Sequence, residues 1–347
     1  TKRWTPTKGV TTYSYDSVAN LTNVAYPSLT NRYAFDAVNR LTNMVDAVGT
    51  TKYTYTLSGG YQITAEDGPW ASDTLTTTNR LGRRMGFGLQ QPSSAWTVTH
   101  SYNAGRIASV TSPAGTFSYL YTNSTPGTAS AGRLVARLQL PTTPASAYIT
   151  NIYDSVGRLL STRLNTSTNV TLNLHEYLYN AAHQRTVGTR TNSSQTAWNG
   201  RIGFSYDKAQ QLVTAWSTNS AGAQVTKECW GYLYDRALNL NARTNNTGGC
   251  SISTYTVNNL NQVTSGAGQS CSYDTNGNMI ARGGPTLDYD AENQLVLYTV
   301  VSGPRTEFIY DGLGRMRVRN EYNWVSGTNY SLSTQTGYIY DGMRVIQ

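Results

Sequence analysis

The stretch Tyr-Asp-Ser-Val-Gly-Arg-Leu at residues 153–159 decides how this chain folds, because its pattern recurs along the whole sequence. A second clean copy, Tyr-Asp-Gly-Leu-Gly-Arg-Met, occupies residues 310–316. Looser copies begin at Tyr15, Phe35, Tyr55, Tyr206, Tyr234, Tyr273, Tyr289 and Tyr340. A repeat that covers a chain is typical of an architecture, and it does not by itself indicate an active site.

The motif predicts the loop of a β-hairpin. Its centre consists of Asp, Asn, Gly and small residues, which form turns because Asp bonds its own backbone and Gly accepts positive φ. An apolar residue follows six places after the aromatic one, as Leu159 follows Tyr153. The residues assigned to these structural turns are Tyr15, Asp16, Phe35, Asp36, Tyr153, Asp154, Gly157, Arg158, Tyr206, Asp207, Tyr234, Asp235, Tyr273, Asp274, Tyr289, Asp290, Tyr310, Asp311, Gly314, Arg315, Tyr340 and Asp341.

The sequence before each turn predicts a strand. Aromatic residues alternate there, as in Tyr177 and Tyr179 or Phe308 and Tyr310, which places each pair on one face. No long stretch has a period of 3.6 residues, so almost no helix is expected. We therefore predict an all-β fold of successive antiparallel hairpins.

The spacing of the copies favours one extended repeat structure. Tyr15, Phe35 and Tyr55 are 20 residues apart, whereas Tyr273 and Tyr289 are 16 apart, so the hairpins differ in length. A propeller would need more uniform blades of roughly 40–50 residues. We expect residues 1–347 to form a single continuous unit, a coiled, hollow shell or solenoid-like sheet stabilised by stacking of neighbouring hairpins.

These motifs resemble the Rhs/YD-repeat family, which includes bacterial Rhs proteins, wall-associated proteins, shell subunits of insecticidal toxin complexes and teneurins. The resemblance covers essentially the whole chain, and residues 338–347 look like the entry to the Rhs-associated core. It implies a large β-shell, often closed around a C-terminal toxin. The aspartates that release the toxin in that family have no match here, and the start at Thr1 in mid-repeat indicates a segment of a longer polypeptide.

Composition favours a protein outside the cell or on its surface. Only 13% of residues are charged, while there are 26 tyrosines and many Thr, Ser and Asn residues. No apolar run is long enough to span a membrane. The net charge of +8 is spread along the chain and many arginines occupy repeat turns, so nucleic-acid binding is not expected.

The three cysteines, Cys229, Cys250 and Cys271, allow one cross-strand disulfide. Folding the hairpin about Leu260 places Cys250 opposite Cys271, and this pair is the predicted bond if the protein is exported. The alternative is three buried thiols.

No catalytic, cofactor or metal site is predicted. The repeat aspartates have the same neighbours each time, which indicates building elements, whereas glycosidase chemistry needs two carboxylates in different environments. Residues 274–285 imitate a calcium loop but lack its Gly and Glu. Asp288, Asp290 and Glu292 could share a strand face and hold a cation, although a strand edge entering a turn explains them better.

The sequence therefore predicts a non-enzymatic structural scaffold. The first hypothesis is a segment of an Rhs-type β-shell that encapsulates or presents a C-terminal toxin or effector domain. The alternatives are a subunit of an extracellular fibre, whose partners are further copies of the chain, and a surface adhesin. The adhesin would contact glycans or a cell surface through Trp70, Trp96, Trp198, Trp216, Trp230 and Trp324.

Overall fold

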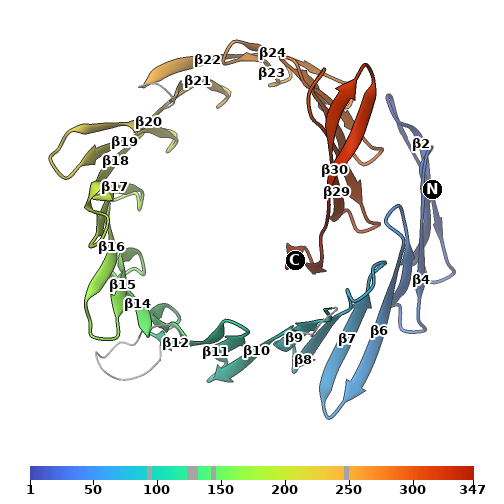
Figure 1. Ribbon diagram of the computed structural model, residues 1–347, viewed down its shortest axis with the longest axis horizontal. Coiled ribbons are helices and arrows are strands. Elements are labelled where there is room, and N and C mark those ends of the chain that lie inside the picture. Colours follow the sequence, from blue (N-terminus) through green and yellow to red (C-terminus); the bar gives the residue numbers. More distant parts are fainter. Residues whose placement is uncertain (92–95, 123–131, 142–145, 246–249) are drawn as a thin grey trace. The chain divides into compact units, whose positions relative to one another are not determined.

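The computed structural model describes residues 1–91, 96–122, 132–141, 146–245 and 250–347. Within these residues the regular structure is β-strand, apart from one short 3₁₀ helix, η1, at Thr196–Trp198. The hairpins follow one another along the chain (Figure 1), and the strand pairing is antiparallel. The predicted all-β fold of successive hairpins is confirmed.

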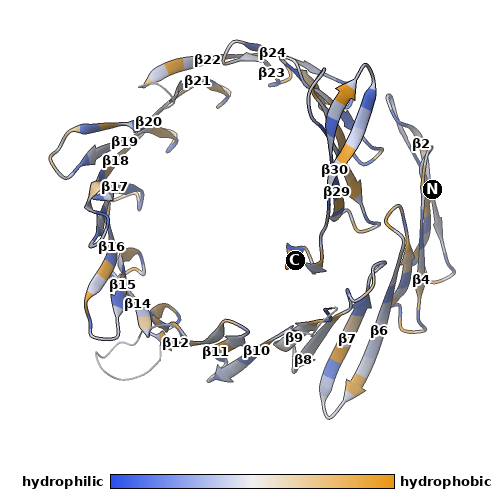
Figure 2. Ribbon diagram, viewed as in Figure 1, coloured by the Kyte–Doolittle hydropathy of each residue, from blue (hydrophilic) through white to orange (hydrophobic). Residues whose placement is uncertain are grey.

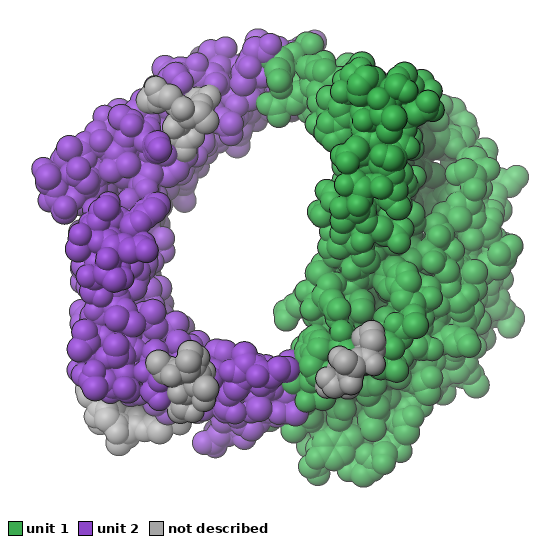
Figure 3. Space-filling model, in the orientation of Figure 1, with its two compact units in different colours: residues 1–97, 269–347 green, residues 98–268 purple. Residues whose placement is uncertain are grey.

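The chain divides into two compact units (Figure 3). Unit 1 combines residues 1–97 with residues 269–347, and unit 2 consists of residues 98–268. The expectation that residues 1–347 behave as one continuous unit stays a prediction.

Unit 1 contains two runs of hairpins, one from each end of the chain. Residues Asp16, Asp36, Asp274, Asp290 and Asp311 lie in the connections between its strands. The first run is β1 Lys2–Thr5, β2 Gly9–Tyr15, β3 Leu21–Ala25, β4 Thr30–Phe35, β5 Leu41–Val45, β6 Thr50–Ser58, β7 Tyr61–Asp67, β8 Leu75–Arg80 and β9 Arg83–Leu89. The second is β24 Gln269–Tyr273, β25 Met279–Arg282, β26 Thr286–Tyr289, β27 Leu295–Thr299, β28 Arg305–Tyr310, β29 Met316–Ser326, β30 Asn329–Gly337, β31 Tyr340–Asp341 and β32 Arg344–Val345.

Unit 2 is a run of antiparallel strands in which each contacts its neighbours in sequence. Its strands are β10 Trp96–Asn103, which begins at the end of unit 1, β11 Arg106–Ser112, β12 Gly115–Tyr121, β13 Val135–Gln139, β14 Ala147–Tyr153, β15 Leu159–Thr166, β16 Thr171–Tyr179, β17 Arg185–Asn192, β18 Gly200–Tyr206, β19 Leu212–Asn219, β20 Gln224–Tyr234, β21 Leu240–Asn245, β22 Ser251–Val257 and β23 Val263–Gly266.

Unit 1 contains buried apolar side chains from both of its runs of hairpins. Met44 and Leu89 are fully buried, and Val24, Leu75 and Val318 are nearly so. Unit 2 buries few apolar side chains, and several large ones, such as Leu178 and Trp216, are exposed. Hydrophobic and hydrophilic residues are mixed along the same strands (Figure 2), as expected of a sheet that has one solvent-exposed face.

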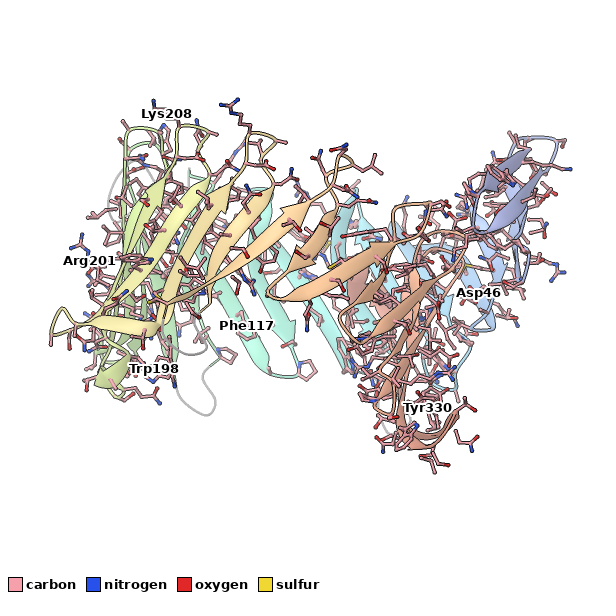
Figure 4. The ribbon with its side chains drawn as sticks, turned by 90° about the horizontal axis from the view of Figure 1, so that it is seen from above. Asp46, Phe117, Trp198, Arg201, Lys208 and Tyr330 are labelled. Atoms are coloured by element: carbon pink, nitrogen blue, oxygen red, sulfur yellow. A yellow bond between two sulfur atoms is a disulfide. The ribbon has the colours of Figure 1, made fainter. Side chains whose placement is uncertain are left out.

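The repeat turns of each run lie on one rim. Apart from the last one, at Asp341 of β31, each connects an even-numbered strand to the next odd-numbered one, as Asp154 connects β14 to β15 and Asp207 connects β18 to β19. In an antiparallel run, every second connection falls at the same end of the strands. Figure 4 shows Lys208, in the turn after β18, at one end of these strands and Trp198, which precedes β18, at the other.

Candidate functional site

The repeat turn is built around its aspartate. Asp154 Oδ1 accepts hydrogen bonds from the backbone N–H groups of Val156 (3.0 Å) and Arg158 (2.8 Å). The backbone N–H of Gly157 donates to the Asp154 carbonyl at 3.1 Å, and Gly157 has φ of 85°. The register shifts between Ile152 and Tyr153. Together these features define a tight turn followed by a left-handed residue and a β-bulge, which is a common way to close a hairpin.

The same bond to the fourth residue recurs in most predicted turns. Side-chain oxygens of Asp16, Asp36, Asp207, Asp235, Asp274, Asp290 and Asp311 make it. Asn180, Asn219 and Asn258 make it as well. The turns after Tyr179 and about Leu260 were expected from the sequence, whereas the turn at Asn219 was not assigned. The signal was present, because Asn shares the side-chain acceptor of Asp. Asp341 differs, since its carboxylate pairs with Arg84.

The third residue after the acid adopts positive φ even where it is not glycine. Ala19, Asn39 and Leu238 have φ of 69°, 62° and 67°. A side chain in this region costs roughly 1–2 kcal/mol, so the turn imposes its geometry against local preference. The hydrogen bonds of the aspartate are the feature that these turns share.

The arginine and tyrosine of the motif link one repeat to the next. Arg158 Nε donates to Asp154 Oδ2 at 2.5 Å, and the Arg158 guanidinium lies 5.0 Å from the ring centre of Tyr179, in the following repeat. The Tyr179 hydroxyl in turn donates to the carbonyl of Leu159 at 2.8 Å. Arginine–tyrosine stacking and tyrosine–carbonyl bonds of this kind recur for the pairs Arg40–Tyr55, Arg106–Tyr121 and Arg315–Tyr340. The motif residues therefore join hairpins as well as closing them.

One repeat turn is buried and forms what we call the arginine cluster, namely Glu66, Asp311, Arg315 and Arg317. Arg315 Nη2 donates to Glu66 Oε1 at 2.6 Å, and Arg315 Nε donates to Asp311 Oδ2 at 2.7 Å. Arg317 Nη1 donates to Asp311 Oδ2 at 3.4 Å. The side chains of Arg315 and Asp311 are each 1% exposed. Because Glu66 belongs to β7, the cluster ties the two runs of unit 1 together.

Gly312 allows this turn to approach the first run. Its N–H donates to Asp46 Oδ2 at 2.7 Å, and its carbonyl accepts from the Tyr33 hydroxyl at 2.6 Å. A Cβ at Gly312 would lie 2.8 Å from the Tyr33 hydroxyl oxygen and 3.0 Å from the sulfur of Met44. Only glycine permits this contact without a shift of the neighbours.

Two further ion pairs join the same two runs. Arg3 makes two hydrogen bonds to the Glu292 carboxylate, at 2.9 and 2.8 Å. Arg84 makes two to Asp341, at 2.8 and 3.0 Å. These pairs are partly exposed, so each contributes less to stability than the arginine cluster. Pairing between residues this far apart in the chain could not be found from sequence spacing.

Burial and pairing shift the titration of the groups around the cluster. Burial raises the pKa of Asp46 and of Asp73 above the ordinary aspartate value. For Arg315, burial opposes the charge, but the hydrogen bond to Glu66 and the charges of Glu66 and Asp311 outweigh it and raise the pKa. In the exposed turns, hydrogen bonds from Asn20 and Arg40 lower the pKa of Asp16 and Asp36, respectively.

The predicted disulfide between Cys250 and Cys271 is wrong. The bond joins Cys229 to Cys250, with Cα atoms 5.7 Å apart, and Cys271 is a free thiol. The hairpin register was the expected one, since Tyr255 pairs with Gly266 and continuing it would bring Cys250 opposite Cys271. However, β23 ends at Gly266, and Ala267 and Gly268 turn the chain with positive φ. Cys271 therefore lies on β24, opposite Arg282 of the next hairpin.

The remaining candidate residues do not form a catalytic or metal site in the described part of the chain. No group of three or more His, Cys, Asp or Glu side chains could hold a metal ion there. Glu292, one of three acids considered for a cation, is paired with Arg3. Among the tryptophans, Trp198, Trp216 and Trp324 are exposed, whereas Trp70 lies under the Arg317 guanidinium at 4.9 Å. In the described residues, no helix has the length and apolar character to cross a membrane.

Comparison with known proteins places this geometry in a class of repeat proteins. The sequence matches the model of the teneurin YD-shell over residues 136–330, which is more than half of the chain. No curated protein matches it. The chain belongs to the teneurin YD-shell family, a family of structural β-shells, and the predicted membership among the Rhs/YD-repeat proteins is confirmed.

Solved structures of toxin complexes are also similar to this chain. The TcdB2-TccC3-Cdc42 structure has 14% identity and a TM-score of 0.48, with 98% of this chain and 23% of that chain covered. TcdB2-TccC3 has 14% identity and a TM-score of 0.47, with 99% and 24% covered. A Tc holotoxin pore of Photorhabdus luminescens has 14% identity and a TM-score of 0.46, with 94% and 22% covered. This chain thus spans less than a quarter of the length of those proteins.

Proposed function

We propose that this chain is a non-catalytic structural scaffold, a segment of an Rhs-type β-shell that encapsulates or presents a C-terminal toxin or effector domain. Its place of action is the cell surface or the extracellular space, in keeping with the few charged residues and many hydroxyl groups of the sequence. Membership in the teneurin YD-shell family supports the role as a structural scaffold. The presence of a cargo domain is the part of the proposal that the experiment below tests.

One observation carries the proposal: the chemically active groups of the motif are used inside the sheet. The repeat aspartates accept backbone N–H groups, the arginines bind those aspartates and stack on tyrosines, and the tyrosines donate to carbonyls. Hydrogen bonds that lower an aspartate pKa stabilise the ionised form, so such a group is a poor proton donor near neutral pH. Motif side chains that are engaged in this way stabilise the sheet and are not available for acid–base catalysis.

The arginine cluster supports a wall that must stay closed. It connects β7 to the turn before β29 through side chains that water scarcely reaches. Removing one partner from such a network leaves an uncompensated buried charge, so the network resists separation of the two runs. A container for a cargo domain needs this kind of resistance to local opening.

The test is protease protection of the cargo in the complete gene product. We expect a domain encoded downstream to resist a protease that degrades the same domain when it is expressed alone. The variant Arg315→Met should expose it faster, while Arg158→Met, at the same motif position in an exposed turn, should not. Cleavage of the downstream domain at its free rate in the wild type would overturn the encapsulating form of the proposal.

A surface adhesin is the second candidate, and the exposed Trp198 and Trp216 of unit 2 favour it. Aromatic side chains with one wet face can stack on sugars. Binding on a glycan array that Trp198→Ala and Trp216→Ala abolish would support this function. A fibre made of further copies of the chain would show instead as assembly that grows with protein concentration in sedimentation velocity.

A further inference from the structure

A cavity of about 670 Å³ lies between the two runs of unit 1. One wall comes from β2 to β4, and the other comes from the repeat turns at residues 289–294 and 310–314. Six aromatic residues line it: Tyr13, Tyr26, Tyr33, Tyr289, Phe308 and Tyr310. This volume lies within the range of about 300–1,000 Å³ that is typical of small-molecule sites.

The lining is acidic and contains no Lys, Arg or His among the described residues. Of its three acids, Glu292 is neutralised by Arg3 and Asp311 by Arg315. Asp290 has no such partner. In six other turns an Arg or Asn four residues on donates to the second carboxylate oxygen, as Arg158 does for Asp154. Asp207 of unit 2, which like Asp290 is followed by a glutamine, is the other turn without this bond among the described residues.

The fourth residue after Asp290 is Gln294, and its side chain does not bond to the Asp290 carboxylate. Gln294 Nε2 donates to the Gly314 carbonyl at 3.1 Å. Asp290 Oδ1 accepts the backbone N–H groups of Glu292 and Gln294, while Asp290 Oδ2 has no hydrogen-bond partner in the described chain. Asp290 is partly exposed and lines the cavity, so one oxygen of its carboxylate is left without a protein donor there.

Asn31 supplies a second unused acceptor. This residue lines the cavity and is 6% exposed. Its Oδ1 atom is buried and has no hydrogen-bond partner among the described residues. Buried side-chain acceptors normally have a donor, so one left open on a cavity wall points to a ligand that brings it.

We infer that this cavity binds a small organic cation that carries an alkylammonium group. Aromatic ring faces attract such a group when it lies within about 6 Å of the ring centre. Asp290 Oδ2 supplies an opposite charge, and Asn31 Oδ1 accepts a hydrogen bond from an N–H or O–H of the ligand. An anion is disfavoured, because every charged group in the lining is acidic.

This inference does not depend on the proposed function, since a wall segment and an adhesin could each carry such a site. The geometry assigns the positive charge of the ligand and the two acceptors that hold it. The volume of the cavity limits the size of the remainder of the ligand.

The test is isothermal titration calorimetry with choline as the probe. Its matched control is the neutral carbon isostere, in which a tert-butyl group replaces the trimethylammonium group. Each is titrated into the wild-type chain and into Asp290→Asn, Asn31→Ala and Asp207→Asn. Asp207 occupies the same motif position with a glutamine, Gln211, four residues on, but it belongs to unit 2 and is not one of the residues that line the cavity. Circular dichroism and thermal melting show whether each variant is folded.

We expect choline to bind at least about tenfold more tightly than the isostere, since only choline gains the charge interaction. Asp290→Asn should remove that preference and Asn31→Ala should weaken binding several-fold, while Asp207→Asn should bind as the wild type does. Equal affinity for choline and the isostere in the wild type would overturn the inference without reference to any variant. So would an equal loss in Asp290→Asn and Asp207→Asn, or no heat of binding at millimolar choline.

Discussion

Replacing Arg315 by methionine should destabilise unit 1 far more than the same change at Arg158. Both arginines bind the aspartate of their own repeat and stack on a tyrosine of the next, at 5.5 and 5.0 Å from the ring centre. They differ in burial, because the Arg315 side chain is 1% exposed and the Arg158 side chain is 29% exposed. The pair of variants therefore isolates the effect of burial on one motif position.

The magnitude follows from the charges left behind. Without Arg315, the Asp311 carboxylate (1% exposed) and the Glu66 carboxylate (18% exposed) lose their main partner. Breaking a buried pair in this way costs about 3–5 kcal/mol, whereas an exposed pair costs about 0.2–1 kcal/mol. The two variants should thus differ by about 3 kcal/mol, which is a large share of the roughly 5–15 kcal/mol that stabilises a typical domain.

Amide hydrogen exchange with mass spectrometry is the assay, because it reports each unit separately. In Arg315→Met, peptides from β7, β28 and β29 should exchange more than a hundredfold faster, the equivalent of about 3 kcal/mol. Peptides of unit 2 should keep their wild-type rates. Adding Glu66→Gln and Asp311→Asn should recover part of the loss, since no charge is then left unpaired.

Equal effects of Arg315→Met and Arg158→Met would refute this reasoning. So would a loss of protection confined to unit 2. In either case the cluster would be an ordinary repeat turn, and its burial would add nothing to stability.

Four further predictions follow from the structure. Leu238→Gly should stabilise the protein by about 1 kcal/mol in urea unfolding, because an exposed side chain with positive φ is removed; a loss of stability would contradict the turn geometry. Tyr179→Phe should cost about 1 kcal/mol by removing the hydrogen bond to the preceding repeat, and no change would count against that link. For Asp73, whose pKa is raised by burial, the folded state holds the proton more tightly, so its stabilising contribution is present at low pH and lost as pH rises through the folded pKa. The free energy of unfolding of Asp73→Asn should therefore rise relative to that of the wild type as the pH is raised from about 4 to about 7. A fall of the variant relative to the wild type over this range would refute the assignment. Non-reducing peptide mapping should find Cys229 joined to Cys250, and reduction should cost about 3 kcal/mol; a peptide that joins Cys250 to the third cysteine would contradict the fold of this hairpin.

Much of the fold could be predicted from local pattern. The alternation of aromatics and the acid at the start of each turn depend on residues a few positions apart, so the hairpins and their loops follow from the sequence. The turn at Asn219 was not predicted because the motif was defined by an acid, although the amide oxygen of Asn accepts the same hydrogen bond. The Cys250 pairing failed for a related reason, because two residues, Ala267 and Gly268, end a strand whose register was otherwise as expected.

The contacts between distant repeats could not be predicted in the same way. Nothing in the spacing distinguishes Arg315 from Arg158, yet one is buried against Glu66 and the other is partly exposed. The distinction depends on which repeats meet when the runs of unit 1 pack, which is a property of the tertiary fold. The free oxygen of Asp290 likewise depends on where Gln294 turns, and Gln294 turns to Gly314 in another repeat.

Single-particle electron imaging of the complete gene product tests the central claim most directly. If the chain is a segment of a cargo-bearing shell, the particles should be discrete and should show density for a separate domain against or within the repeat wall. Filaments of stacked copies, or a repeat wall with no associated domain, would contradict the proposed function and make the exposed surfaces of the sheet its working parts.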